Sequence, residues 1–214
     1  MVFAIDRAGL VGEDGPTHHG VFDVGFLRQI PGLMVLTPAN FHELQTMLRW
    51  AVEEYDGPVA VRYPRGNTEA IVNSVEMAFT PSRIQKRCSG ENVTLIGYGS
   101  LICELEAAAK LLKERGIDAG VLQLLSVSHY SKEQLAAAVR GKHVFVIEEI
   151  CSGSGISGEI ALSLRAMGYT GTVHPIDLGK DFVPHGSMRS LYKQTGIDSV
   201  SISDSVMEVI GHEN

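Results

Sequence analysis

The residues best suited to chemistry gather between Asp6 and Gly20, in the stretch DRAGLVGEDGPTHHG. Arg7 offers a planar fork for a phosphate or a carboxylate, and Asp14 and His18 offer a proton-handling pair. The apolar run Val2–Ile5 precedes the stretch and predicts a buried parallel strand, whose carboxyl end is where open α/β sheets bind ligands. A loop so rich in glycine is costly to order, which indicates that it takes part in chemistry.

The spacing of Asp14 and His18 also fits a simpler interpretation, in which Asp14 forms an Asx turn and His18 is a surface histidine. His19 should point elsewhere, into a supporting or an exposed position. Neighbouring histidines rarely bind one ion together, and no third ligand is close in sequence. We therefore expect no metal site.

A second set of candidates follows other predicted strands. Arg65 lies in VRYPRGN, just beyond a predicted strand, so Arg7 and Arg65 could clamp one phosphate from two sides. The alternative is salt bridging to Asp6 or Glu69 at the surface. Arg62 alternates with Arg65 and more plausibly serves structure.

Two adjacent acids, Glu148 and Glu149, end another predicted strand and precede a glycine-rich loop and a helix. Such a loop can bind an anion at the helix N-terminus, or it can be only a tight strand-to-helix turn. We favour the turn, because the two acids would repel an anion.

Composition limits the class of protein. The chain has 214 residues, 44% of them hydrophobic, which is enough for one large or two small domains. A net charge of −7 without a basic stripe argues against nucleic acid. No apolar run approaches the ~20 residues of a membrane span, and the N-terminus lacks the charged start and the small-residue cleavage site of a signal peptide. Three widely spaced cysteines fit reduced thiols, so we expect a cytoplasmic protein with no membrane partner.

Strand and helix patterns alternate along two segments, which predicts an α/β fold of two mostly parallel βαβ units. The units span residues 1–67 and 92–214, and residues 68–91 are expected to be a linker with Arg83, Lys86 and Arg87 on a solvated face. The strands are expected at 2–5, 34–37, 59–63, 93–98, 119–127, 143–148 and 172–178. The helices are expected at 21–29, 41–55, 100–115, 131–140, 156–167, 188–195 and 204–210.

Several motifs carry a family resemblance. They are DRAG, GEDGPTHHG, LTPAN (36–40) and VRYPRGN (61–67), followed by VTLIGYGS (93–100), FVIEE (145–149) and FVPHGS (182–187). Together they resemble the 1-deoxy-D-xylulose-5-phosphate synthase branch of the transketolase family. The resemblance covers nearly the whole chain and matches the second half of the pyrimidine-binding domain plus a complete C-terminal domain.

The resemblance implies roles for the candidates. His18 and Asp14 would be catalytic groups near the reactive carbon of thiamine diphosphate, where carbanion addition to a carbonyl generates and consumes protons. Arg7 and Arg65 would hold the phosphate of glyceraldehyde 3-phosphate. The intact enzyme uses thiamine diphosphate and magnesium.

This chain lacks the family's diphosphate-binding domain and the glutamate that contacts the aminopyrimidine. We therefore expect no cofactor and no catalysis for the chain alone, which would be the C-terminal portion of such an enzyme. The expected partners are small-molecule substrates in the intact enzyme, and either a second copy of the chain or the missing N-terminal half. The alternatives are a non-catalytic assembly or regulatory module, or one subunit of a split enzyme.

Overall fold

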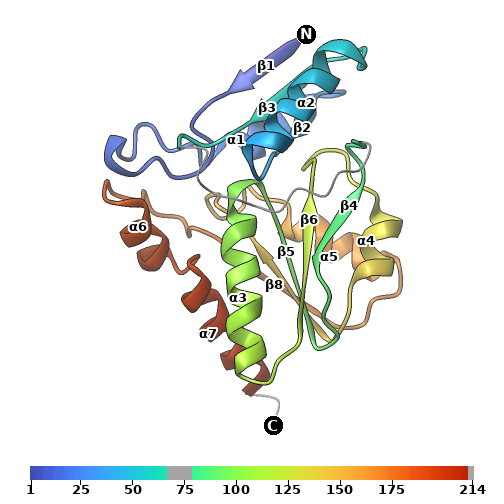
Figure 1. The fold of residues 1–214 in the computed structure, drawn as a ribbon, viewed down its shortest axis with the longest axis vertical. Helices are drawn as coiled ribbons and strands as arrows, with labels where there is room; N and C mark the ends of the chain where they lie inside the picture. Colours follow the sequence, from blue (N-terminus) through green and yellow to red (C-terminus); the bar gives the residue numbers. More distant parts are fainter. Residues whose placement is uncertain (67–78, 212–214) are drawn as a thin grey trace.

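The computed structural model describes residues 1–66 and 79–211, which form two units that we call the first and the second unit (Figure 1). The first unit has a three-stranded parallel sheet in the order β1-β3-β2. A loop with a short 3-10 turn, η1 (Gly12–Asp14), joins β1 to the first helix. The elements are β1 (Val2–Ile5), α1 (Asp23–Leu27), β2 (Met34–Leu36), α2 (Phe41–Glu53) and β3 (Val59–Arg62).

The second unit has a five-stranded sheet in the order β4-β6-β5-β7-β8, parallel except where β4 pairs with β6. Helices α3 and α7 cover one face, and α4 and α5 cover the other (Figure 1). The strands are β4 (Ile84–Cys88), β5 (Val93–Tyr98), β6 (Ala119–Leu124), β7 (His143–Ile147) and β8 (Thr172–Ile176). The helices are η2 (Gly99–Leu101), α3 (Ile102–Glu114), α4 (Lys132–Ala138), α5 (Ser157–Ala166), α6 (Met188–Thr195) and α7 (Ser199–Gly211).

The α/β fold with two parallel-sheet units is confirmed, and so are the helix starts that rest on capping residues. Asn40 accepts a hydrogen bond from the backbone N–H of Glu43 at 2.8 Å, and Glu43 accepts one from Ala39 at 2.8 Å. Ser131 and Ser187 cap α4 and α6 in the same way. These reciprocal bonds fix the start of α2 at the carboxyl end of β2.

Two expectations about the sheet are wrong. Strand β4 lies inside the segment expected to be a linker, and the guanidinium-bearing side chain of Arg87 is 2% exposed rather than solvated. The remainder of that segment falls partly on residues 67–78, outside the described residues. Strand β4 pairs with β6 at the edge of the sheet, where a polar strand is tolerated.

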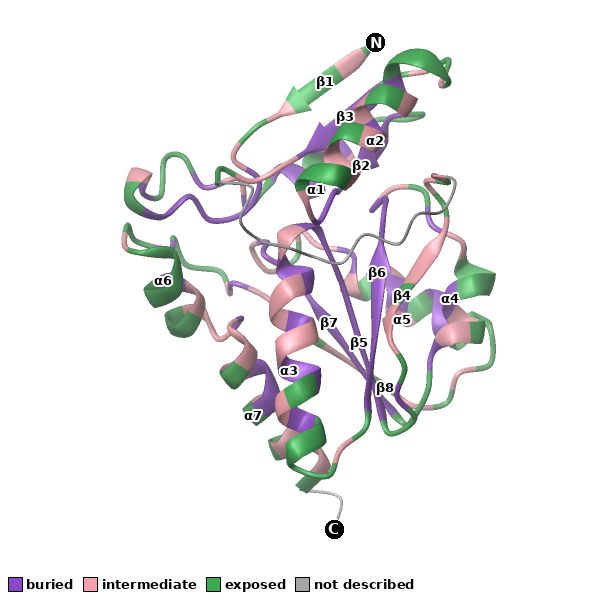
Figure 2. Cartoon of the chain, viewed as in Figure 1, coloured by how far each residue is buried: buried purple, intermediate pink, exposed green. Residues whose placement is uncertain are grey.

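Strand β1 is also not the buried strand that its apolar sequence predicts. It forms the edge of the first sheet, and Phe3 is 43% exposed. Figure 2 shows β1 in pink and green, whereas β5 and β6 are purple along their length. Two core clusters lie mainly on the faces of the second sheet, one of which extends into the first unit through Val35 and Ala60, and a third lies mainly in the first unit around β2, β3 and α2.

None of the helices in the described part of the chain is long and apolar enough to cross a membrane. The terminal helix α7 begins at Ser199, five residues before its expected start. Asp198 explains the difference, because its carboxylate accepts hydrogen bonds from the backbone N–H groups of Val200 at 3.1 Å and Ser201 at 3.3 Å.

Candidate active site

The loop from Asp6 to Gly20 leaves the carboxyl end of β1 and folds back on itself. Gly20 donates a hydrogen bond to the Arg7 carbonyl at 3.0 Å, and Gly9 donates one to the Gly20 carbonyl at 2.9 Å. Arg7 has a φ of 62°, which is unusual for a residue other than glycine. Asp6 holds this conformation by accepting hydrogen bonds from the Arg7 backbone N–H at 2.7 Å and from its Nη1 at 2.8 Å.

Three of the predicted site residues meet at one carboxylate oxygen. Arg65, at the carboxyl end of β3, donates a hydrogen bond from Nη1 to Asp14 Oδ2. The Nε of Arg7 lies 3.8 Å from the same oxygen. The hydrogen bond from Arg65 lowers the pKa of Asp14, and the charges of Arg65, His18 and Arg7 add to that effect. Asp14 is therefore a carboxylate held between two guanidinium groups.

The structure places His18 near this cluster but does not bond it there. Its side chain is exposed, and Nδ1 lies 3.0 Å from the hydroxyl of Thr17. His19 is buried, which agrees with the supporting position expected for it and not with the exposed one. Val11 donates its backbone N–H to His19 Nδ1 at 3.0 Å, which leaves the proton on Nε2 to face the Pro184 carbonyl at 3.3 Å. His19 thus ties the loop to the second unit.

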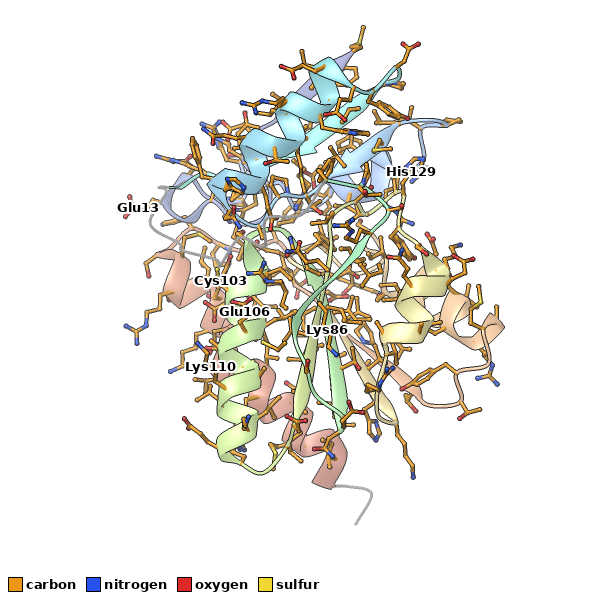
Figure 3. The ribbon with its side chains drawn as sticks, turned by 45° about the vertical axis from the view of Figure 1, so that its right-hand side comes forward. Glu13, Lys86, Cys103, Glu106, Lys110 and His129 are labelled. Atoms are coloured by element: carbon orange, nitrogen blue, oxygen red, sulfur yellow. The ribbon has the colours of Figure 1, made fainter. Side chains whose placement is uncertain are left out.

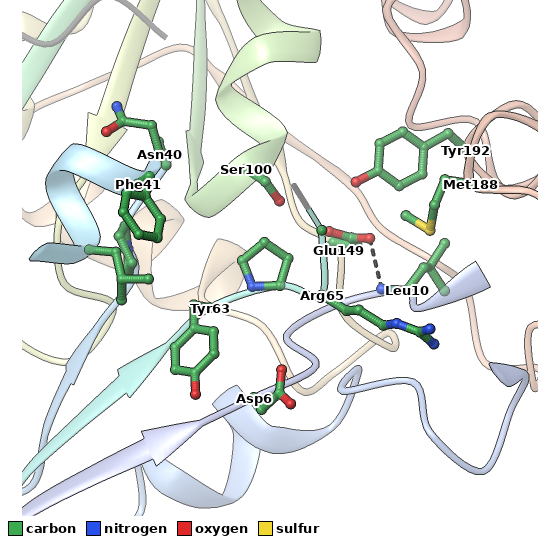
Figure 4. Close-up of a pocket in the computed structure, with 15 residues that line it drawn as sticks. Asp6, Leu10, Asn40, Phe41, Tyr63, Arg65, Ser100, Glu149, Met188 and Tyr192 are labelled. Atoms are coloured by element: carbon green, nitrogen blue, oxygen red, sulfur yellow. Dashed lines mark hydrogen bonds between the residues drawn. The ribbon is translucent and has the colours of Figure 1, made fainter. Parts of the chain in front are cut away.

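A cavity of about 770 Å³ opens beside Arg65, between the two units (Figure 4). Arg65, Tyr63 and Asp6 line it from the first unit, and the start of α2 adds Asn40 and Phe41. The second unit contributes Ser100, Glu149, Met188 and Tyr192. A cavity with mostly apolar walls and a few convergent polar groups is typical of a small-molecule site.

A buried ion pair lies at the end of the Asp6–Gly20 loop. Arg62 Nε donates to Asp23 Oδ2 at 2.8 Å, and Arg62 Nη2 donates to the Gly20 carbonyl at 2.8 Å. Both side chains are less than a tenth exposed. The structural role expected for Arg62 agrees with this geometry, because the pair joins β3, α1 and the end of the loop.

The acids after β7 have separate surroundings. Glu148 accepts hydrogen bonds from the backbone N–H groups of Ile156 at 2.8 Å and Ser157 at 3.0 Å, and from the Tyr98 hydroxyl at 2.9 Å. The N-terminus of α5 is therefore capped by the chain's own carboxylate, which supports the turn interpretation over an anion site. Glu149 instead faces the loop of the first unit and the cavity.

Sequence reasoning missed Glu149 and Tyr192 as cavity residues. Burial raises the pKa of Glu149 to about 7, although the hydrogen bond from Leu10 opposes the rise. Burial likewise raises the pKa of the Tyr192 hydroxyl, and the nearby Glu149 adds to it. Two adjacent acids at a strand end were a usable signal, because strand ends in α/β sheets point into ligand clefts.

The comparisons with known proteins identify the family. The model "Transketolase, pyrimidine binding domain" matches residues 1–70, and the model "Transketolase, C-terminal domain" matches residues 82–202, more than half of the chain. The chain belongs to the transketolase family. The second match begins before β4, so the family's C-terminal domain includes the strand that we expected to be linker.

Individual relatives within the family indicate which of its enzymes this chain is similar to. The chain is 37% identical over 214 residues to 1-deoxy-D-xylulose-5-phosphate synthase of Chlorobium luteolum, covering 97% of this chain and 33% of that protein. It is 38% identical to the synthase of Heliobacterium modesticaldum, covering 98% of this chain and 32% of that protein. The transketolase-family chain thus spans about a third of the length of these relatives.

Solved transketolase structures share the fold. A structure titled "Split gene transketolase, inactive beta4 tetramer" superposes with a TM-score of 0.81 at 23% identity and covers 97% of this chain and 65% of that chain. A transketolase from Campylobacter jejuni superposes with a TM-score of 0.76 at 19% identity, over 97% of this chain and 31% of that one. At these identities the likeness establishes the fold.

Proposed function

We propose that this chain is the substrate-binding portion of a 1-deoxy-D-xylulose-5-phosphate synthase-like transferase, which condenses pyruvate with glyceraldehyde 3-phosphate and releases carbon dioxide. Arg7 and Arg65 grip the phosphate of the acceptor, and His18 and Asp14 move protons. The observation that carries the proposal is the convergence of Arg7 and Arg65 on one oxygen of Asp14. Because Arg65 bonds to this oxygen and Arg7 Nε lies 3.8 Å from it, the two guanidinium groups could contact one phosphate between them.

The cofactor of such an enzyme would be held elsewhere. Among the residues described, no group of three His, Cys, Asp or Glu side chains could hold a metal ion. We expect the chain alone to be inactive and to bind thiamine diphosphate poorly. Calorimetry with magnesium present tests this, and micromolar binding would contradict it.

A chimaera tests the function itself. This chain replaces the matching third of the Chlorobium luteolum synthase, and product formation from pyruvate and glyceraldehyde 3-phosphate is measured. In an active chimaera, Arg65→Ala is expected to lower kcat/KM for glyceraldehyde 3-phosphate by about 30-fold to 1,000-fold, the scale of losing a charged partner. Use of pyruvate should barely change, because pyruvate has no phosphate.

Two further variants separate the roles. Arg65→Lys keeps the charge but loses the bidentate fork, so its loss should be smaller than that of Arg65→Ala. His18→Ala should lower kcat rather than raise KM for the acceptor. Equal losses for both substrates in the Arg65→Ala chimaera would make Arg65 structural. A folded chimaera that binds the cofactor but forms no product would refute the proposal.

A second candidate is one subunit of a split enzyme, in which another chain carries the cofactor site. It draws on the likeness to the structure titled as a split-gene transketolase, of which this chain covers 65%. Purification of the native protein from its source would distinguish the two. A single longer polypeptide carrying this sequence favours the first, and a stable complex with a separate chain favours the second.

A further inference from the structure

The carboxyl group of Glu149 is in direct contact with the loop backbone. Glu149 is 6% exposed and lies two residues beyond the end of β7. Its Oε1 accepts a hydrogen bond from the backbone N–H of Leu10 at 2.8 Å, drawn as a dashed line in Figure 4. Gly9 packs so closely on the same carboxyl group that an added Cβ would overlap it. Glu149 thus fits against two successive backbone positions of the loop.

In the sequence, this contact lies between two members of the Arg7–Asp14–Arg65 cluster. Leu10 follows Arg7 by three residues and precedes Asp14 by four. In the described part of the chain, two other hydrogen bonds join the loop to the second unit: His19 Nε2 with the Pro184 carbonyl at 3.3 Å, and the Gly186 N–H with the Gly12 carbonyl at 3.3 Å. Of these contacts, the one at Leu10 depends on a buried acid.

The groups around Glu149 leave its charge poorly compensated. Arg62 on β3 is the nearby cation, but it is bonded to Asp23 on α1, whose charge opposes ionisation of Glu149. Tyr192 on α6 contributes a hydrogen bond from its hydroxyl. Among the described residues no salt bridge to Glu149 forms within 4.0 Å. Burial disfavours the charged form of a carboxyl group, and a cation that is already paired with another acid compensates that charge only weakly. These surroundings therefore favour the protonated form of Glu149.

We propose that Glu149 is a positioning residue that holds the Asp6–Gly20 loop against the second unit, and that it holds the loop more firmly when its carboxyl group is protonated. Opening of the loop would return the carboxyl group to water, where its pKa is near its ordinary value. Ionisation therefore favours the open loop.

The sign of the pH dependence follows from linkage. Burial raises the pKa of Glu149 to about 7 in the closed loop, above its ordinary value. The opening equilibrium should then rise with pH below about 7, by up to about tenfold per pH unit, and level off above it. The closed loop is thus lost as pH rises, not as it falls.

Amide exchange of the full chain tests the proposal. Hydrogen exchange at Leu10, corrected for the intrinsic rate, is measured by NMR across pH 5.5 to 8.5. Wild type should show the rise and the plateau. Glu149→Gln keeps an oxygen that can accept the same N–H but cannot ionise, so its opening constant should stay low and independent of pH. Glu148→Gln is the matched control, since Glu148 bonds to α5 and Tyr98, and it should keep the wild-type profile.

Two results would overturn the proposal. One is a Glu149→Gln profile that follows wild type, which would assign the pH dependence to another group. The other is an ordinary glutamate pKa for Glu149, measured by following its carboxyl carbon through a pH titration of the wild-type protein. This measurement does not depend on whether any variant folds. Both measurements use the chain without substrate, so their failure leaves the proposed transferase function untouched.

Discussion

Asp14 and Arg65 lie 51 residues apart in the sequence and share a hydrogen bond beside the cavity that Arg65 lines. The Nε of Arg7 lies 3.8 Å from the same carboxylate oxygen, Asp14 Oδ2. Under the proposed function, Asp14 occupies the position near the two arginines in which the phosphate of the acceptor would be held. A tetrahedral anion must therefore compete with Asp14 for the two guanidinium groups.

Removal of the Asp14 charge should strengthen anion binding. Asp14→Asn is expected to bind sulfate several-fold more tightly than wild type, and Asp14→Asn combined with Arg65→Ala should lose that gain. Because Arg65 lowers the pKa of Asp14, the wild-type carboxylate stays charged through the neutral range and its competition persists there. Calorimetric titration with sulfate, whose charge is constant from pH 5.5 to 8, is the measurement. No change in Asp14→Asn would mean that sulfate binds elsewhere.

Arg87 is expected to be among the most sensitive positions for stability. Its Nε donates to Glu106 Oε1 at 2.8 Å, and its Nη1 lies 3.9 Å from Glu43 Oε1 across the boundary between the units. Glu106 lies on the face of α3 seen in Figure 3, on the same helix as Cys103 and Lys110. Arg87→Ala leaves both acids without this cation and should lower the free energy of unfolding by about 3–5 kcal/mol.

Urea denaturation measures this loss, with Lys86→Ala as the matched control. Lys86 is the neighbouring residue of β4 and is exposed, so its replacement should change stability by less than about 0.5 kcal/mol. Similar small effects for both variants would show that the ion pairs of Arg87 with Glu43 and Glu106 contribute little to stability.

The Arg7–Asp14–Arg65 cluster could be predicted in part from the sequence, whereas the ion pairs of Arg87 could not. Arg7 and Arg65 could be brought together from the sequence because each follows a parallel strand, and parallel strands end at one edge of a sheet. Arg87 could not be placed, because IQKRC alternates weakly and an antiparallel edge strand depends on its distant partner β6. The Glu149–Leu10 contact spans 139 residues and follows no local pattern. Asp198, by contrast, was a readable cap that would have placed the start of α7.

The exposed edge of β1 should promote self-association. In the described part of the chain β1 pairs only with β3, and Phe3 is 43% exposed beside the free edge. An unpaired edge with apolar side chains favours pairing with another chain. We expect concentration-dependent association in sedimentation velocity, reduced by Phe3→Lys.

Val52→Lys is the matched control for this experiment. Val52 is 72% exposed on α2, so the substitution adds the same charge away from the β1 edge and should leave association unchanged. A monomer at all concentrations would count against association through β1. Equal weakening by both variants would indicate a general effect of charge.

A pair of glycines separates backbone strain from packing on Glu149. Gly9 and Gly32 both have positive φ, 74° and 76°, so alanine strains the backbone at either position by about 1–2 kcal/mol. An alanine Cβ at Gly32 meets open space, whereas at Gly9 it overlaps the Glu149 carboxyl group. Gly9→Ala should therefore lower the free energy of unfolding by ~1–3 kcal/mol more than Gly32→Ala. In the double variant Gly9→Ala, Glu149→Ala the overlap disappears. Urea denaturation should therefore show a smaller loss of unfolding free energy in the double variant than the sum of the losses in the two single variants. Strict additivity would show that Gly9 does not pack on Glu149 in solution.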